Sequence, residues 1–258
     1  MRVVGGSLLV QLVCVLCALP AASASAQPGS GPRETIDQGF TAARPKTPTG
    51  ASFTGVYHAA GNPKANPPYM RRMVFYPPRG MRYDTRVPER CTATDLELSV
   101  RGGAACPPGS RLGGGTTEGL FFEPVANAFV LTPYKNALDM FNNANEQIMV
   151  IASGGFGYYT VVRGRIRSDQ SVEFASPTCF PAPPAGQQCP RDYILQRGSS
   201  TVMPRYTRSS GGRVRSYFTT PPKCPARGYW QTRVKFWWAD GAIDDLASNE
   251  PCRHARRR

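Results

Sequence analysis

The segment from Cys106 to Thr116 reads CPPGSRLGGGT. From Gly109 onward it nearly matches the phosphate-binding loop G-x-x-x-x-G-K-[ST], but Gly115 replaces the lysine that contacts the β- and γ-phosphates. Pro107 and Pro108 precede the loop-like part and a β-like run follows it, whereas a phosphate loop connects a buried strand to a helix. The pattern argues against a nucleotide site. We expect the glycines to bring a strand close to neighbouring backbone or to form a bulge.

Residues for acid, base and nucleophilic chemistry are few. The chain has two histidines, His58 and His254, and no G-x-S-x-G motif that would present a serine nucleophile. A glycoside hydrolase needs only two carboxylates about 5 to 10 Å apart. Glu118 and Glu123 are an odd number of residues apart on one expected strand and so face opposite sides. Either could pair with a third carboxylate, for which the candidates are Glu146 and Glu173.

Metal sites are not expected. Asp240, Asp244 and Asp245 lack the alternating ligand spacing of a calcium loop, and the cysteines form no C-x-x-C pair for zinc. We therefore expect no metal and no other cofactor.

Aromatic and basic side chains offer the best candidate binding site. On the expected strand from Tyr229, Trp237 faces away from the core together with Arg233 and Lys235, and an aromatic ring beside cations can stack on sugars or meet an anionic polymer. Tyr159, after the glycine-rich SGGFG, is a weaker candidate. The alternative is that both faces of this strand are covered and Trp237 is ordinary packing.

The first residues indicate export. Met1 and Arg2 precede an apolar run that ends in Ala24-Ser25-Ala26, which predicts a secretory signal peptide over residues 1–26, cleaved before Gln27. The run is too short for a permanent membrane span, and no later run approaches the length of a membrane helix. We expect a secreted protein, extracellular or associated with the cell wall.

Six of the eight cysteines follow the signal peptide, and an even number in an oxidising compartment favours disulfides. Six cysteines allow 15 connectivities. Because they fall along the chain as three pairs of neighbours, we predict the bonds Cys91–Cys106, Cys179–Cys189 and Cys224–Cys252.

The net charge of +14 comes mainly from arginine. A basic exported protein is drawn to anionic partners, so an anionic cell-wall polymer or polysaccharide is the expected partner and nucleic acid is not.

The hydrophobic pattern predicts an all-β fold, an antiparallel β-sandwich or jelly roll with one or two short helices. Apolar residues alternate with polar ones in short runs separated by glycine and proline. These runs lie at residues 52–58, 71–76, 118–125, 128–132, 146–153, 158–167, 171–175, 192–197, 213–220 and 229–247. Residues 27–50 show no hydrophobic period, which predicts a disordered leader or linker. We expect the β-sandwich domain to span residues 51–252 and a basic tail to follow at residues 253–258.

Local sequence signals predict individual strands, turns and helices. Trp230, Thr232, Val234, Phe236 and Trp238 share the core face of one strand, and Asp240-Gly241 forms a two-residue hairpin turn after it. Thr92 as N-cap, Asp95 and the stop at Gly102-Gly103 predict a short helix between Cys91 and Cys106. A further helical turn is expected after Asn136.

The run CTATDLELSVRGGAACPPGSRLGGGT and the cysteine-bracketed C-terminal hairpin with Ala-Asp-Gly at its tip resemble a group of functionally uncharacterised secreted actinobacterial proteins. Those proteins carry a cysteine, a short helical spacer and C-P-x-G-S-x-[hydrophobic]-G-x-G. The resemblance covers about a third of the mature chain and implies an exported, disulfide-bonded β-sandwich without an assigned activity. We therefore expect a non-enzymatic surface or binding module of the cell envelope. The alternative is a secreted glycan-directed hydrolase with paired carboxylates.

Overall fold

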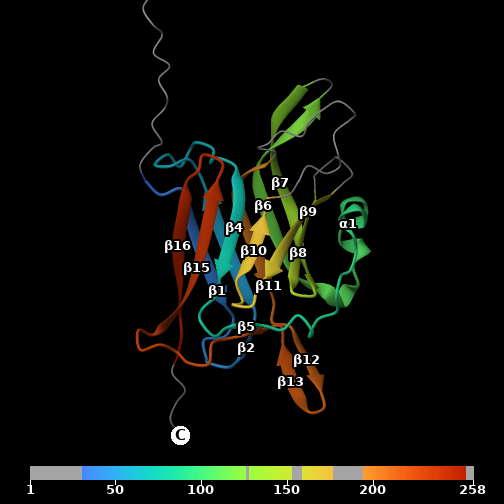
Figure 1. Ribbon diagram of the computed structural model, residues 1–258, viewed down its shortest axis with the longest axis vertical. Coiled ribbons are helices and arrows are strands. Elements are labelled where there is room, and N and C mark those ends of the chain that lie inside the picture. Colours follow the sequence, from blue (N-terminus) through green and yellow to red (C-terminus); the bar gives the residue numbers. More distant parts are fainter. Residues whose placement is uncertain (1–30, 126–127, 153–158, 177–193, 254–258) are drawn as a thin grey trace, which may run out of the picture.

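The computed structural model describes residues 31–125, 128–152, 159–176 and 194–253, and it is almost entirely β-structure (Figure 1). One antiparallel sheet of eleven strands curls into a near-barrel. The all-β prediction is confirmed. The described part of the chain contains no helix with the length and apolarity that a membrane crossing needs.

The large sheet has the spatial order β1-β3-β11-β6-β7-β8-β9-β10-β4-β15-β16. Its strands are β1 (Glu34–Phe40), β3 (Ala51–Tyr57), β11 (Ile194–Met203), β6 (Arg111–Val125), β7 (Ala128–Asn143), β8 (Glu146–Ala152), β9 (Tyr159–Ile166), β10 (Val172–Ala175), β4 (Met70–Tyr76), β15 (Tyr229–Trp238) and β16 (Ile243–Pro251). Two small sheets accompany it, formed by β2 (Pro48–Thr49), β14 (Phe218–Thr219) and β5 (Arg82–Tyr83), and by β12 (Thr207–Ser210) and β13 (Arg213–Ser216).

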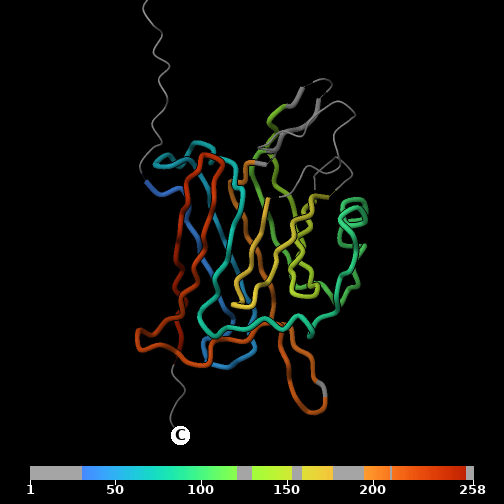
Figure 2. Tube along the Cα trace, viewed as in Figure 1, coloured from blue at the N-terminus to red at the C-terminus, as the bar shows by residue number. Residues whose placement is uncertain are grey.

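The two edge strands of the large sheet, β1 and β16, lie side by side and close the barrel (Figure 2). An odd number of antiparallel strands places the first and last in the same direction. No backbone ladder joins them in the described structure, and side chains of β16 take the place of backbone acceptors. The Gln38 amide donates to Ser248 Oγ at 3.0 Å, and the Glu250 carboxylate faces the backbone of Phe40. We call this junction the seam.

The strand β1 corrects the predicted leader. Residues 27–50 were expected to be disordered, but Glu34–Phe40 pairs along its whole length with β3, and Pro48–Thr49 forms β2. The domain therefore begins before residue 51. The predicted signal peptide lies outside the described residues.

The C-terminal hairpin follows the predicted alternation. Trp230, Thr232, Val234, Phe236 and Trp238 are buried, and the residues between them are exposed or half-buried. The predicted two-residue turn is wrong: β15 ends at Trp238 and β16 begins at Ile243, with Gly241 at a φ of 88° within the longer connection. The predicted disulfide Cys224–Cys252 is present beside this hairpin.

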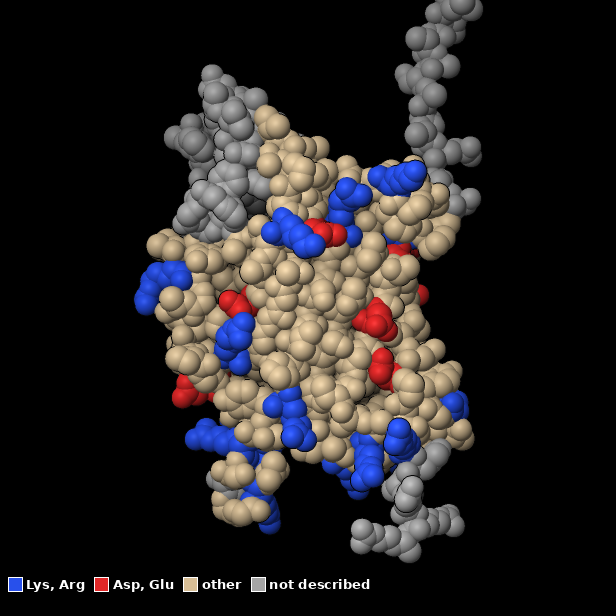
Figure 3. Space-filling view, turned by 180° about the vertical axis from the view of Figure 1, so that it is seen from behind, with Lys and Arg blue, Asp and Glu red and all other residues tan. Residues whose placement is uncertain are grey.

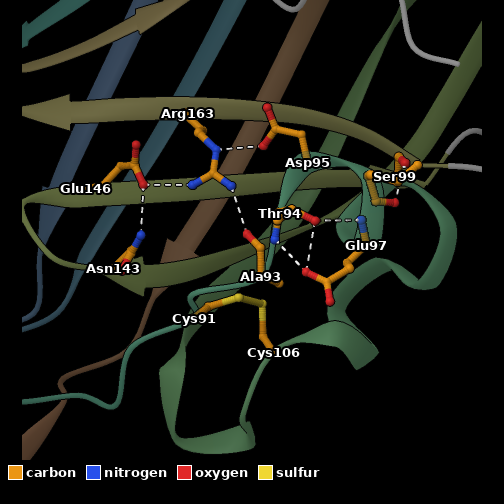
Figure 4. Close-up of polar contacts among 11 residues, drawn as sticks. Cys91, Ala93, Thr94, Asp95, Glu97, Ser99, Cys106, Asn143, Glu146 and Arg163 are labelled. Atoms are coloured by element: carbon orange, nitrogen blue, oxygen red, sulfur yellow. Dashed lines mark hydrogen bonds and ion pairs between the residues drawn. A yellow bond between two sulfur atoms is a disulfide. The ribbon is translucent and has the colours of Figure 1, made fainter. Parts of the chain in front are cut away.

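The second predicted disulfide, Cys91–Cys106, brackets the helix α1 (Asp95–Arg101), as predicted. Its N-cap is Thr94 and not Thr92: Thr94 and Glu97 form a reciprocal capping box (Figure 4). Gly102 ends the helix at a φ of 58°, and the 3-10 turns η1 (Gly102–Ala105) and η2 (Pro108–Ser110) lead into β6. The predicted bond Cys179–Cys189 lies outside the described residues.

Helix α1 lies against β9 and packs on the outer face of β7, β8 and β9. Leu98 packs there against Phe141, Ile148 and Val150, all of which are buried. The helical turn expected after Asn136 is wrong, because that segment is the second half of β7. Leu138 and Met140 of this half reach the barrel core and Phe141 packs on the outer face against Leu98, while Asp139 pairs with Arg111.

The glycine-rich segment belongs to β6, and both roles expected of its glycines, a bulge and close approach to neighbouring backbone, are observed. The strand has a bulge between Arg111 and Gly113. A Cβ on Gly113 would lie 2.1 Å from the Val202 carbonyl oxygen, and one on Gly115 would lie 1.8 Å from that of Ser200. These glycines therefore let β6 and β11 approach closely.

Candidate functional site

The barrel contains a cavity of about 130 Å³. Its walls are the inward side chains of strands from both halves of the sheet, and most of them are apolar. Among them are Phe53, Phe75, Leu138, Val162 and Phe174. The volume is similar to that of an engineered protein cavity of about 150 Å³ that binds benzene. A ring-sized apolar molecule therefore matches this space.

Methionine is concentrated around the cavity. The chain has seven methionines, and all except Met1 line it. They are Met70, Met73, Met81, Met140, Met149 and Met203. A methionine side chain is unbranched, flexible and polarisable, so it adapts to ligands of different shape and makes favourable contacts with aromatic rings. The walls of this cavity can therefore rearrange around a bound molecule.

Most polar groups on the cavity wall are already hydrogen-bonded to the protein. Gln147 Nε2 donates to the Tyr217 hydroxyl at 3.1 Å. Gln196 Nε2 donates to Thr117 Oγ1 at 3.2 Å, and Thr117 Oγ1 donates to the Gly198 carbonyl at 3.2 Å. These hydrogen bonds fix the side chains, so their polar groups need no hydrogen bond from a ligand.

Thr232 is different. It lies on the inward face of β15, lines the cavity and is only 2 % exposed. Its Oγ1 atom is buried and has no hydrogen-bond partner among the described residues. Leaving a buried hydroxyl unpaired costs about 1–3 kcal/mol. A group that could pair with it inside the cavity would recover part of that free energy.

Charge is nearly absent from the cavity wall. The only charged residue among its described lining is Arg72. The Arg72 guanidinium lies 3.6 Å from the centre of the Trp237 ring, on the outer face of the sheet, and pairs with Glu173 at 3.2 Å. Because the charge of Arg72 is directed outward, the cavity suits an uncharged molecule.

A second polar cluster lies at the seam. Trp238 Nε1 donates to Glu34 Oε1 at 2.9 Å and to Asp244 Oδ2 at 2.7 Å, and the two carboxyl groups hydrogen-bond to each other. Burial, reinforced by Asp244, raises the pKa of Glu34 to about 8. Arg33 pairs with Asp240 at 2.7 Å and with Asp244 at 3.6 Å. The sequence does not indicate this cluster, because Glu34 falls in the segment predicted to be a disordered leader.

The predicted binding residues do not form one site. Trp237, Arg233 and Lys235 share the outer face of β15, as predicted, and Lys235 Nζ lies 5.7 Å from the centre of the Trp237 ring. Arg72 already covers that ring, and Arg233 pairs with Asp245. Tyr159 lies elsewhere, on β9, where it packs against the end of α1 at Gly102.

The carboxylates considered for hydrolysis are bound to cations. Glu118 pairs with Lys135 at 3.7 Å, Glu146 with Arg163 at 2.8 Å, and Glu173 with Arg72 and Arg167. His58 follows β3 and contacts the Ala59 carbonyl through Nδ1. None of these four candidate groups lines the cavity in the described structure, although Arg72, which pairs with Glu173, does.

Basic side chains do not form one continuous patch on the face shown in Figure 3, where Lys and Arg lie in separate groups with Asp and Glu between them. Within the described residues, no group of three His, Cys, Asp or Glu side chains could hold a metal ion. Comparison with protein-family models, curated proteins and solved structures finds no match for this chain.

Proposed function

We propose that this protein is a non-enzymatic binding protein that holds a small, mainly apolar molecule inside its barrel. The observation that supports the proposal is the cavity of about 130 Å³, lined by six methionines. Burying apolar ligand surface supplies roughly 25 cal/mol per Å², so a ring-sized molecule gains several kcal/mol from transfer alone. The function class is the one expected from the sequence, while the ligand site is the interior and not the outer face of β15.

We also propose that the protein acts outside the cell. The disulfides Cys91–Cys106 and Cys224–Cys252 support an oxidising compartment, and the sequence predicts a signal peptide. Binding of an anionic polymer at Trp237 remains a prediction from the sequence. It is less well supported, because Arg72 occupies the ring face that a sugar would need.

The hydrolase alternative is also less well supported. Glu34 and Asp244 form a carboxyl pair at the seam, but they hydrogen-bond directly to each other. Glycosidases keep their two carboxyl groups about 5 to 10 Å apart, so that a sugar and a water can lie between them. The pair at the seam leaves no such space.

The experiment is a titration of the full chain with fluorobenzene, followed by fluorine NMR. The variant Ala51→Leu fills the cavity, because Ala51 is 4 % exposed and lines it. We expect wild type to broaden and shift the fluorobenzene signal and the variant to lose this effect. Ala247→Leu makes the same change at an exposed position of β16 and should bind as wild type does. Absence of binding to the wild type, or equal binding to both variants, would overturn the proposal.

A further inference from the structure

The unpaired hydroxyl of Thr232 carries information about the ligand. A native fold rarely buries a hydroxyl without a partner, and such a group in a cavity marks a place where a bound molecule can complete its hydrogen bonding. The Thr232 Oγ1 atom is buried and unpartnered within the described structure, and the residue lines the cavity. A threonine hydroxyl can donate one hydrogen bond and accept others.

The residues around Thr232 further restrict the class of ligand that the cavity can bind. The cavity wall is dominated by methionine and phenylalanine, and the one charged residue of its described lining, Arg72, contacts Glu173 and Trp237. A charged ligand would lose its hydration without gaining a partner of opposite charge. A purely apolar ligand would fill the space but leave the Thr232 hydroxyl unpaired.

We infer that the barrel binds an uncharged molecule with a ring-sized apolar body and one hydroxyl group, and that Thr232 is the residue that hydrogen-bonds this group. The inference rests on the proposed function and deepens it by naming the ligand class. The methionines contact the apolar body, and their flexibility lets the wall close around substituents on the ring.

The test compares three probes built on the same fluorinated ring, namely fluorobenzene, para-fluorophenol and para-fluorobenzoate, by fluorine NMR titration of the full chain. We expect para-fluorophenol to bind about five-fold more tightly than fluorobenzene, which corresponds to one net hydrogen bond. We expect para-fluorobenzoate to bind more weakly than either neutral probe, because the cavity offers its charge no partner.

Two substitutions at Thr232 then separate shape from hydrogen bonding. Thr232→Val keeps the volume and removes the hydroxyl, so it should abolish the preference for para-fluorophenol while fluorobenzene binding persists. Thr232→Ser keeps the hydroxyl and should retain the preference. Thr117→Val is the matched control, since the Thr117 hydroxyl lines the same cavity but is already bonded to Gly198 and Gln196.

The outcomes distinguish the inference from the proposed function. If no probe binds, the proposed function fails and the inference fails with it. If fluorobenzene binds but para-fluorophenol is not preferred, or if Thr232→Val leaves the preference unchanged, only the inference is overturned. Tighter binding of para-fluorobenzoate than of the neutral probes would also overturn it. Retained fluorobenzene binding shows that each variant is folded.

Discussion

The carboxyl groups of Glu34 and Asp244 hydrogen-bond to each other across the seam, and both accept the indole N–H of Trp238. Glu34 is on the first strand of the sheet and Asp244 on the last. Burial favours the protonated form of the Glu34 carboxyl and raises its pKa, and the neighbouring Asp244 carboxylate reinforces this because like charges at this distance repel. Nearby Arg33 lowers the pKa of Glu34, but burial and Asp244 outweigh it.

We predict that this pair makes stability fall as the pH rises. The folded-state pKa of Glu34 is about 8, against an ordinary value of 4.5, so between these values the folded protein holds a proton that the unfolded chain releases. This contribution is fully present below about pH 4.5 and lost above about pH 8, with a slope of at most about 1.4 kcal/mol per pH unit. Denaturant unfolding between pH 5 and pH 8 measures it.

The matched variants are Glu34→Gln and Glu118→Gln. Glutamine mimics the protonated carboxyl, so Glu34→Gln should flatten most of the pH dependence and exceed wild type in stability at pH 8. Some dependence should remain, because burial also raises the pKa of Glu250 at the seam. Glu118 is exposed, and its replacement should leave the slope as in wild type. An unchanged slope in Glu34→Gln would refute the prediction.

Removal of the Thr232 hydroxyl should stabilise the free protein. Valine has the shape of threonine without the buried, unpaired Oγ1 atom, so we expect Thr232→Val to raise the free energy of unfolding by about 1 kcal/mol. Thermal unfolding without added ligand should show a rise of about 2–4 °C for a domain of this size. Thr117→Val, which breaks existing hydrogen bonds, should lower the melting temperature instead. A lower melting temperature for Thr232→Val would contradict this account.

Arg163 should hold the helical segment against the barrel. Its guanidinium contacts Asp95 at 2.6 Å, Glu146 at 2.8 Å and the Ala93 carbonyl at 2.9 Å (Figure 4). Its side chain is 29 % exposed, so we expect Arg163→Ala to lower the free energy of unfolding by about 2 kcal/mol. Amide hydrogen exchange should rise mainly between Cys91 and Cys106.

The control is Arg165→Ala, two residues along the same strand at an exposed position. It should change stability by less than about 0.5 kcal/mol. Equal effects of the two alanine variants, or exchange that rises uniformly over the protein, would show that Arg163 has no special role.

Gly115 should not tolerate a side chain. A Cβ at this position would lie 1.8 Å from the Ser200 carbonyl oxygen, which is backbone and cannot move without disturbing the β6–β11 pairing. We expect Gly115→Ala to destabilise the protein by at least about 2 kcal/mol. Thr116→Ala, at the adjacent exposed position, is the control and should have a small effect in the same unfolding experiment. Near-equal stabilities would rule out the close approach of these strands.

The sequence predicted those elements whose inner and outer faces differ in polarity. Alternation along Trp230–Trp238 identified β15 and its buried face, and the spacing of the cysteines predicted both described disulfides. Strands in which polar and apolar residues do not alternate with burial were not predicted. In β1 the inward residues include Glu34 and Gln38, which are buried but polar, so the strand resembled a disordered segment.

The second half of β7 was not predicted as a strand because polarity does not follow burial there: Asn142 is polar but buried, and Phe141 is apolar and packs on the outer face against Leu98. The cavity was also missed. Its walls come from strands far apart in the chain, and only the inward placement of six scattered methionines marks it. The shared inward placement of these methionines can be recognised only when the strand register is known. The seam cluster likewise depends on a contact between the first and last strands, which local pattern cannot show.

The parallel course of β1 and β16 has a mechanical consequence. Because the strands run in the same direction, the start of β1 and the end of β16 lie at opposite ends of the seam. Tension applied to the two ends of the folded segment therefore loads this junction in shear. The contacts of Glu34, Gln38 and Phe40 with β16 would then bear the force together and would not peel apart in succession.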